Sequence, residues 1–203
     1  MGQTSVSFFP LPIKSEHVCI RSLDGGDLED LYALETDPEV KRYISAPVPT
    51  PKDEWMRPMR DRLGADTCAL AIILNDDGSF VGSSLGVTCC TTTSSDSELQ
   101  IESEIEIQVL IARRFWGNGF GRDAVSELIR AAFELQEVTS IVAVVDPENT
   151  ASRKLMDNLG FQHDGQKSSP GCWDDNHIIF RLARPREKTA LTAPATLPHS
   201  SHG

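Results

Sequence analysis

Basic residues are scarce in this 203-residue sequence, which has 19 Lys and Arg against 30 Asp and Glu. The formal net charge is therefore −11. A nucleic-acid partner is not expected, because phosphate binding depends on clustered Lys and Arg. The acidity favours a cationic substrate through long-range steering, although an acidic surface also simply keeps a protein soluble.

Long apolar runs and paired cysteines are also missing. No stretch approaches the roughly 20 apolar residues that span a bilayer, and the first residues lack the basic start and apolar run of a signal peptide. The five cysteines are odd in number and include no Cys-x-x-Cys pair, so neither a disulfide framework nor a metal site is expected. We therefore expect a cytoplasmic protein with reduced thiols, no metal and no membrane contact.

Hydrophobic periodicity predicts seven strands and four helices. The predicted strands span residues 17–23, 67–75, 80–90, 102–112, 140–145, 161–168 and 173–182. The predicted helices span residues 27–36 and 51–62, the segment that follows the glycine turn at 116–122, and residues 149–159. A polar loop is expected at 91–97. This mixed order predicts one α/β domain around a partly antiparallel sheet.

The turn WGNGFGR at 116–122 places three glycines at alternate positions just before an amphipathic helix. Glycines let backbone N–H groups approach an anion closely, and the helix N-terminus adds a partial positive charge. The glycine spacing fits neither the dinucleotide fingerprint nor a Walker A loop. The turn therefore predicts a phosphate cradle, and a purely structural role for the glycines is the alternative.

This strand, turn and helix resemble motif A of the GNAT acyltransferases, whose pattern is Gln/Arg-x-x-Gly-x-Gly/Ala. Two registers fit, one beginning at Arg114 and one at Trp116. We prefer Trp116, because a Trp there resembles the RimJ/RimL-like branch of the family. The resemblance extends over about residues 10–184 and includes three further segments, namely residues 37–44, residues 78–83, and the Asn-x-x-Ser and Gly-Phe pieces at 149–152 and 160–161.

The resemblance implies a GNAT fold, which is a mixed, mostly antiparallel seven-stranded sheet flanked by about four helices. Residues 1–9 are then a flexible lead and residues 185–203 a disordered tail. It also implies an acetyl-coenzyme A co-substrate, with the pantetheine arm at Leu110 and Ile111. The implied coenzyme site further comprises Trp116, Gly117, Asn118, Gly119, Phe120, Gly121 and Arg122 at the pyrophosphate, and Asn149 and Ser152 near the thioester.

The acceptor amine must lose a proton before it attacks the thioester, and a carboxylate can take that proton directly or through water. Glu106 is the predicted base and Glu104 the alternative, although both also suit a solvated strand face. Ser152 is the predicted proton donor to the leaving thiolate, since Met156 stands where many relatives carry a Tyr. Positioning alone can also supply much of the acceleration.

The resemblance predicts transfer of an acetyl group to a primary amine by direct attack in a ternary complex. The acceptor is a protein N-terminus or a small-molecule amine, and the enzyme a monomer or homodimer. The alternative is a catalytically silent module that binds acyl-coenzyme A and acts through a partner. Trp55, Trp173, Asn176 and His177 lie in segments that border the acceptor site in relatives, yet a surface or core role is favoured for each.

Overall fold

The computed structural model describes residues 10–44, 51–63, 69–84, 88–93, 101–135, 137–164 and 177–185. The expected lead at 1–9 and residues 186–203 of the expected tail lie outside these ranges. The strands are β1 (Ile13–Lys14), β2 (Val18–Ser22), β3 (Leu70–Leu74), β4 (Phe80–Ser84), β5 (Thr88–Thr93), β6 (Ile101–Glu106), β7 (Val109–Ile111), β8 (Val138–Val145), β9 (Gln162–Asp164) and β10 (Ile178–Ala183). The α-helices are α1 (Leu28–Thr36), α2 (Pro38–Lys41), α3 (Lys52–Arg62), α4 (Phe120–Glu134) and α5 (Thr150–Asn158).

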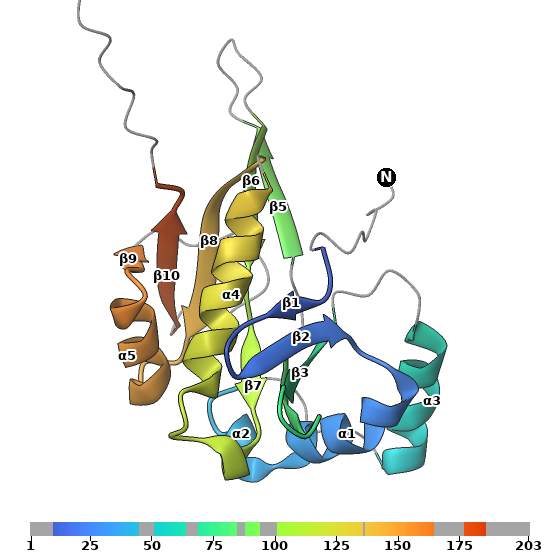
Figure 1. The fold of residues 1–203 in the computed structure, drawn as a ribbon. Helices are drawn as coiled ribbons and strands as arrows, with labels where there is room; N and C mark the ends of the chain where they lie inside the picture. The colour runs from blue at the N-terminus through green and yellow to red at the C-terminus, as the bar shows by residue number, and fades with distance from the viewer. Residues whose placement is uncertain are drawn as a thin grey trace, which may run out of the picture.

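The strands form two five-stranded sheets (Figure 1). The first has the order β1-β2-β3-β4-β7 and is antiparallel throughout. The second has the order β5-β6-β8-β10-β9, and within it β6 and β8 are parallel. Parallel neighbours need a long crossover, which here contains α4. The predicted α/β class and GNAT-type mixed sheet are confirmed.

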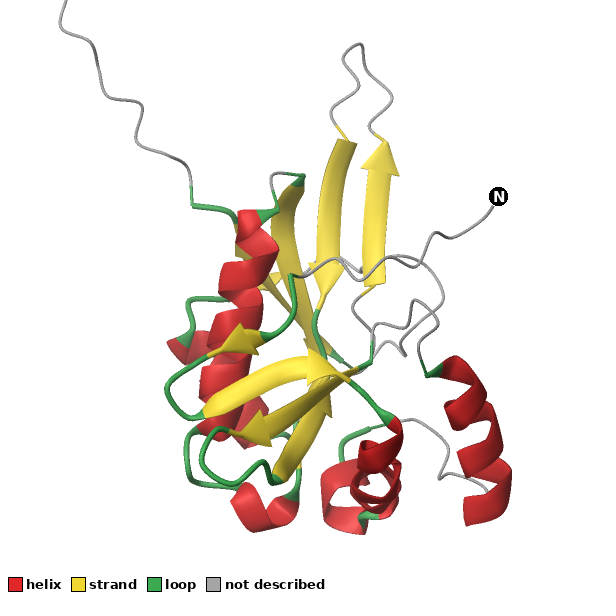
Figure 2. Ribbon diagram, turned by 45° about the vertical axis from the view of Figure 1, so that its right-hand side comes forward, coloured by secondary structure: helices red, strands yellow, loops and turns green. Residues whose placement is uncertain are grey.

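Two predicted strands each divide into two, which accounts for most of the extra strands. The predicted strand at 80–90 becomes β4 in the first sheet and β5 in the second, and the predicted strand at 102–112 becomes β6 and β7 in the same way. In Figures 1 and 2 the two sheets diverge, so one regular strand cannot pair along its whole length with both. The short β1 and α2 complete the difference from the predicted count.

Helix α4 packs against both sheets and supplies much of the main core. Its buried residues are Ala124, Val125, Leu128, Ala131 and Ala132, which recur at helical spacing along one face. They cluster with buried residues of β2, β3, β6, β8 and β10. On the other side of the first sheet, α1 and α3 cover a second core that includes Leu31, Met56 and Phe80.

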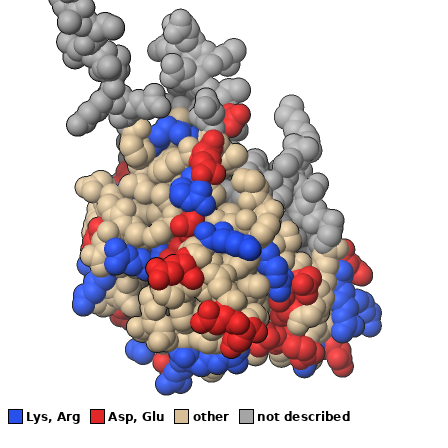
Figure 3. Space-filling model, in the orientation of Figure 1, with Lys and Arg blue, Asp and Glu red and all other residues tan. Residues whose placement is uncertain are grey.

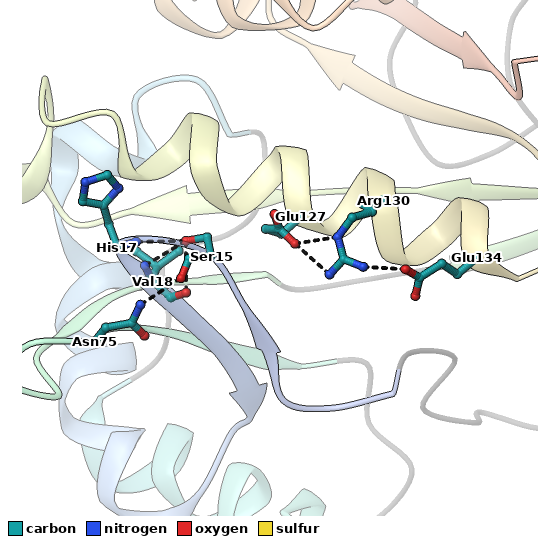
Figure 4. A network of polar contacts seen from close by, with 7 residues as sticks. All are labelled: Ser15, His17, Val18, Asn75, Glu127, Arg130 and Glu134. Carbon is teal, nitrogen blue, oxygen red and sulfur yellow. Dashed lines mark hydrogen bonds and ion pairs between the residues drawn. The ribbon is translucent and has the colours of Figure 1, made fainter.

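Polar contacts fix the start of the first sheet and the outer face of α4 (Figure 4). The Ser15 hydroxyl donates to the Val18 carbonyl at 3.1 Å, and the Asn75 amide donates to the Ser15 carbonyl at 3.0 Å. On α4, Arg130 donates to Glu127 at 2.8 Å and also contacts Glu134. Both acids lie one turn from Arg130, so these pairs stabilise the helix surface weakly.

The predicted turn signals are largely confirmed. Gly78 adopts a left-handed φ of 73° between β3 and β4, and the Asn149 side chain accepts from the Ser152 N–H at 3.0 Å to cap α5. Two expectations were wrong in detail. Pro51 precedes α3 instead of being its first residue, and β5 continues to Thr93, within the segment expected to be a polar loop, because it pairs with β6.

Acidic and basic side chains alternate in small groups on the face shown in Figure 3. Within the described ranges, no three His, Cys, Asp or Glu side chains come together as a metal ion would require. A search of the same residues finds no helix that is long and apolar enough to span a bilayer. Cys19 is a free, partly buried thiol.

Candidate functional site

A pocket of about 450 Å³ lies where the two sheets part. It is lined by β7, the glycine turn and the start of α4, by the end of β8, and by α2 and α5. The chain thus brings four separated segments to one concave surface, because β7, the glycine turn and the start of α4 are continuous. Most polar groups predicted to carry the chemistry lie on it.

The pocket forms because the chain pairs with β8 through β6 and then turns away from β8 at β7. The Ile107 N–H donates to the Val142 carbonyl at 2.9 Å, and β7 then pairs with β4 instead. The close approach of β7 to β4 needs a glycine, since a Cβ on Gly82 would lie 2.0 Å from the Leu110 carbonyl oxygen. The end of β8, from Ala143 to Val145, pairs with β10 and faces the gap with its other edge.

The glycine turn presents backbone N–H groups at the N-terminus of α4. Gly117 and Gly119 have left-handed φ values of 79° and 86°, which side chains other than glycine rarely adopt. The Asn118 amide donates to the carbonyls of Phe115 and Trp116 at 3.1 and 3.2 Å. No side chain caps α4 at Gly119, so the first-turn N–H groups are available to an anion.

The pocket collects nearly all the residues predicted to bind the coenzyme. Its lining includes Leu110, Ile111, Trp116, Gly117, Gly119, Phe120, Gly121, Arg122, Asn149 and Ser152. Asn118 is the exception, because its side chain turns back to stabilise the loop. Gly121 lies against Ile111 of β7, where a Cβ would make ordinary van der Waals contact at 3.4 Å.

The two motif registers differ in where their first residue points. Trp116 lines the pocket. Arg114 instead donates to the Phe80 carbonyl at 3.3 Å and lies 3.6 Å from the Asp30 carboxylate. The placement of these two side chains favours the register that begins at Trp116.

The two candidate bases also differ in their surroundings. Glu106 lines the pocket. Glu104 lies outside the lining, where it forms an ion pair with Arg181 and accepts from the Ser140 hydroxyl at 3.0 Å. Arg181 also pairs with Asp164, and burial lowers the pKa of its guanidinium. Of the two candidate bases, only Glu106 lies on the pocket, which favours it over Glu104.

Helix α5 supplies the predicted hydroxyl. Ser152 lies in the first turn, with its N–H held by Asn149, and both residues line the pocket. Met156, one turn further on, is 4% exposed and also reaches the lining. Asn149 therefore acts at least as a helix cap, whatever it does for a ligand.

Sequence reasoning missed the contribution of α2. Glu39, Val40, Tyr43 and Ile44 line the pocket, although residues 37–44 are predicted from sequence only to form a short helical turn and to resemble a family segment. His177 joins them, against the expectation of a surface or core role. Trp173 and Asn176 lie outside the described residues. The available signal was a helical turn capped by Asp37, with Pro38 as its first residue and an acid and an aromatic residue after it.

An ion pair also stands beside the start of α4. His17 Nδ1 lies 2.7 Å from Asp123 Oδ2, and this hydrogen bond raises the pKa of the His17 imidazole. Asp123 is in the first turn of α4. Neither residue lines the pocket, yet the pair sets the charge close to the predicted phosphate cradle.

Residues 17–162 match the family model described as the acetyltransferase (GNAT) domain. An uncharacterized N-acetyltransferase of Bacillus licheniformis is 30% identical over 155 residues, which is 74% of this chain and 82% of that protein. The FsC-acetyl coenzyme A-N(2)-transacetylase of Aspergillus fumigatus is 26% identical over 64% of this chain and 56% of its own length.

Solved structures share the fold at lower identity. A GNAT-family acetyltransferase of Bacillus anthracis superposes with a TM-score of 0.65 at 22% identity, covering 85% of this chain and 98% of that one. The spermidine N-acetyltransferase of Vibrio cholerae, in complex with CoA and spermine, gives a TM-score of 0.61 at 18% identity, covering 82% and 94%. These likenesses establish the architecture alone.

Proposed function

This chain belongs to the acetyltransferase (GNAT) family, and from that premise we propose that it moves the acetyl group of acetyl-coenzyme A to a primary amine. Its class as an acyltransferase enzyme follows from its relatives. The acceptor and the roles of individual residues are the proposal. We also propose the RimJ/RimL-like branch, because Trp116 lines the pocket and Arg114 does not.

One observation carries this proposal. The glycine turn, the open edge of β7 and the carboxylate of Glu106 converge on a single pocket. A turn for phosphates and a strand edge for an extended arm suit the binding of acyl-coenzyme A, and a carboxylate nearby suits removal of the amine proton. The cradle fits a pyrophosphate, since the N–H groups that begin α4 carry no side-chain cap.

The donor then lies along the gap. The pyrophosphate sits at residues 117–122, and the pantetheine arm runs beside β7 toward Glu106. Two relatives support this donor by name, one through acetyl coenzyme A and the other through bound CoA. Backbone N–H groups bind the phosphates, so an acidic chain can still hold an anionic co-substrate.

The acceptor enters from the side of α2. Glu106 takes one proton from the ammonium group, and the freed nitrogen attacks the thioester carbonyl carbon. A C–N bond forms, and the C–S bond breaks as the tetrahedral intermediate collapses. The second proton of the nitrogen passes through the Ser152 hydroxyl or water to the departing thiolate, which leaves a neutral amide and a free thiol, and Glu106 returns its proton to solvent. Glu39 adds a second carboxylate to this side of the lining, which supports a cationic acceptor.

Release of free thiol from acetyl-coenzyme A, with a panel of primary amines and peptides, tests the proposal. Glu106→Gln should preserve coenzyme binding and lower kcat about 100-fold, the scale of general-base catalysis. Glu104→Gln is the matched control and should change stability more than kcat, because Arg181 loses its partner.

Equal turnover in the Glu106 variant and the unaltered protein would remove Glu106 as the base. Tight coenzyme binding with no thiol release for any amine would favour a silent binding module. Failure to bind coenzyme A would contradict the proposed function itself.

A further inference from the structure

Trp116 is exposed and yet fixed. Its side chain is 48% exposed, and it is the one large hydrophobic side chain among the described residues that is classed as exposed. Its indole Nε1–H donates to the Ile111 carbonyl at 2.7 Å. A ring that only trailed into solvent would need no such partner, so the bond holds the apolar face in one place.

The bond falls on the open edge of β7. The Ala112 N–H donates to the Val81 carbonyl at 2.8 Å, and Leu110 pairs with Ser83. Backbone groups alternate in direction along an antiparallel strand. The N–H and C=O of Ile111 therefore point away from β4, toward the gap.

The direction of these backbone groups indicates which residue of β7 can bond to the coenzyme through its backbone. The Leu110 carbonyl faces β4, next to Gly82, so it does not point into the gap. Ile111 offers an N–H donor and a carbonyl with two lone pairs. One lone pair accepts from Trp116, which leaves the other for an amide N–H of a ligand.

The ring also lies at a particular point along the site. Trp116 lies between Ile111, whose carbonyl it contacts, and the glycine turn, which it directly precedes. Glu106 lies at the other side of Ile111 along the chain. A ligand with phosphates at the turn and its reacting end at Glu106 passes Trp116 with the segment next to the phosphates.

We propose that Trp116 is a positioning residue for acyl-coenzyme A, and the inference rests on the proposed function. The indole ring covers the pantetheine arm next to the pyrophosphate, and the indole N–H holds the Ile111 carbonyl in line for the pantetheine amide. Burial of an exposed, immobilised ring favours binding without further ordering of the side chain.

Substitutions of Trp116 separate the role of its apolar ring from the role of its indole N–H. Trp116→Phe keeps an apolar ring but removes the N–H, and should weaken coenzyme A binding about fivefold, the loss expected for one hydrogen bond. Trp116→Ala removes both and should weaken binding on the order of 50-fold. The KM for acetyl-coenzyme A should rise in the same order, while kcat stays within about threefold, because the ring is remote from the reacting atoms.

A comparison of two ligands tests whether Trp116 contacts the pantetheine arm or the nucleotide part of coenzyme A. Coenzyme A carries the pantetheine arm, and 3′-phospho-ADP has the same nucleotide and phosphates without it. Trp116→Ala should weaken binding of coenzyme A and leave that of 3′-phospho-ADP nearly unchanged. In a Trp55→Phe, Trp173→Phe background, coenzyme A should alter the fluorescence of the remaining Trp116 more than 3′-phospho-ADP does.

Trp55→Phe alone is the control for loss of an indole elsewhere, and thermal unfolding checks that each variant is folded. Equal coenzyme A affinity in Trp116→Ala and the unaltered protein would overturn the inference. Equal weakening of both ligands would overturn the assignment to the pantetheine arm. If the unaltered protein bound neither ligand, the proposed function would fail first.

Discussion

The two sides of the pocket are built in different ways. The proposed coenzyme side comes mainly from one continuous segment, residues 109–125, which runs from β7 through the glycine turn into α4. The proposed acceptor side is assembled from α2, Glu106, the end of β8 and His177, which are far apart in sequence. A continuous segment can encode its ligand in a short motif, whereas an assembled surface depends on how distant elements meet.

This contrast predicts where substitutions act. Changes on the coenzyme side should alter affinity for acetyl-coenzyme A with any amine. Changes on the acceptor side should alter the response to the amine alone. The variants that follow test this division, beginning with the largest expected effect.

Gly119→Val should raise the KM for acetyl-coenzyme A on the order of 100-fold or more, since it disturbs charge-assisted hydrogen bonds worth about 1.5–3 kcal/mol each. A Cβ at Gly119 meets no protein atom within 4 Å, so the protein should still fold. Gly78→Val is the matched control, because Gly78 has a similar φ of 73° and equally open surroundings in a turn outside the pocket lining. A similar KM in the two variants would contradict the cradle.

Arg181→Met should destabilise the fold by about 2–3 kcal/mol, because it leaves Glu104 and Asp164 without their cation in a partly buried site. Arg130→Met, which removes an exposed arginine from α4, should cost about 1 kcal/mol or less. Urea unfolding of both variants checks the difference. Equal losses would show that the Glu104 cluster is no more than a surface pair.

Glu39→Gln should raise the KM for a cationic amine about fivefold and leave the KM for acetyl-coenzyme A unchanged, as expected for one screened charge contact. Glu54→Gln on α3 makes the same change in net charge at an exposed position outside the lining. Steady-state kinetics with each substrate varied in turn separates the two effects. A matching change in both variants would mean that only the overall charge matters.

A substitution of Glu35 tests the contact between α1 and α3. Burial raises the pKa of its carboxyl, which accepts from the Trp55 indole at 3.1 Å. The folded state thus favours the neutral form, and stability falls as the pH rises through the raised pKa. Glu35→Gln should therefore stabilise the protein more at pH 7 than at pH 4, by less than about 1 kcal/mol because solvent screens the site.

Thermal unfolding at the two pH values measures this gain. Glu137→Gln, at an exposed position before β8, should show no such dependence on pH. A gain from Glu35→Gln that is the same at pH 4 and pH 7 would argue against a raised pKa.

The smallest effect on stability is expected from the contact between His17 and Asp123, beside the start of α4. The hydrogen bond to Asp123 raises the pKa of the imidazole, so its stabilising effect is complete below the ordinary pKa of about 6.5 and is lost as the pH rises through the folded value. Asp123→Asn should lower the pKa of His17 in an NMR titration. An unchanged titration curve would show that the contact does not persist in solution.

The glycine turn could be predicted from sequence because its signals are local. Three alternating glycines stand directly before an amphipathic helix, and all but one of the residues predicted to bind the coenzyme line the pocket. Their binding of a coenzyme stays a prediction. The break between β6 and β7 could not be predicted in this way. Ile105, Ile107, Val109 and Ile111 continue one apolar face across it, so the side-chain pattern carries no trace of the change of partner.

The roles of residues on the proposed acceptor side, in contrast, could not be predicted from the sequence. Glu104 and Glu106 lie on the same face of an alternating strand, and only the tertiary structure places Glu106 in the pocket and Glu104 beside Arg181 of β10. Likewise, residues 37–44 alone signal a capped helical turn, but not that Glu39 and Tyr43 line the same pocket as the glycine turn. Such roles follow from tertiary contacts, which a single sequence does not display.

The parting of β7 from β8 also has a consequence for local unfolding. Each sheet is hydrogen-bonded within itself, and the gap between them lacks the rungs that would join Ile111 to the end of β8. A bound pantetheine arm would supply part of that ladder. Amide protons along β7 should then exchange faster with solvent in the free enzyme than in the enzyme with bound coenzyme. We also expect the two sheets to open separately in the free enzyme and together once the co-substrate bridges them.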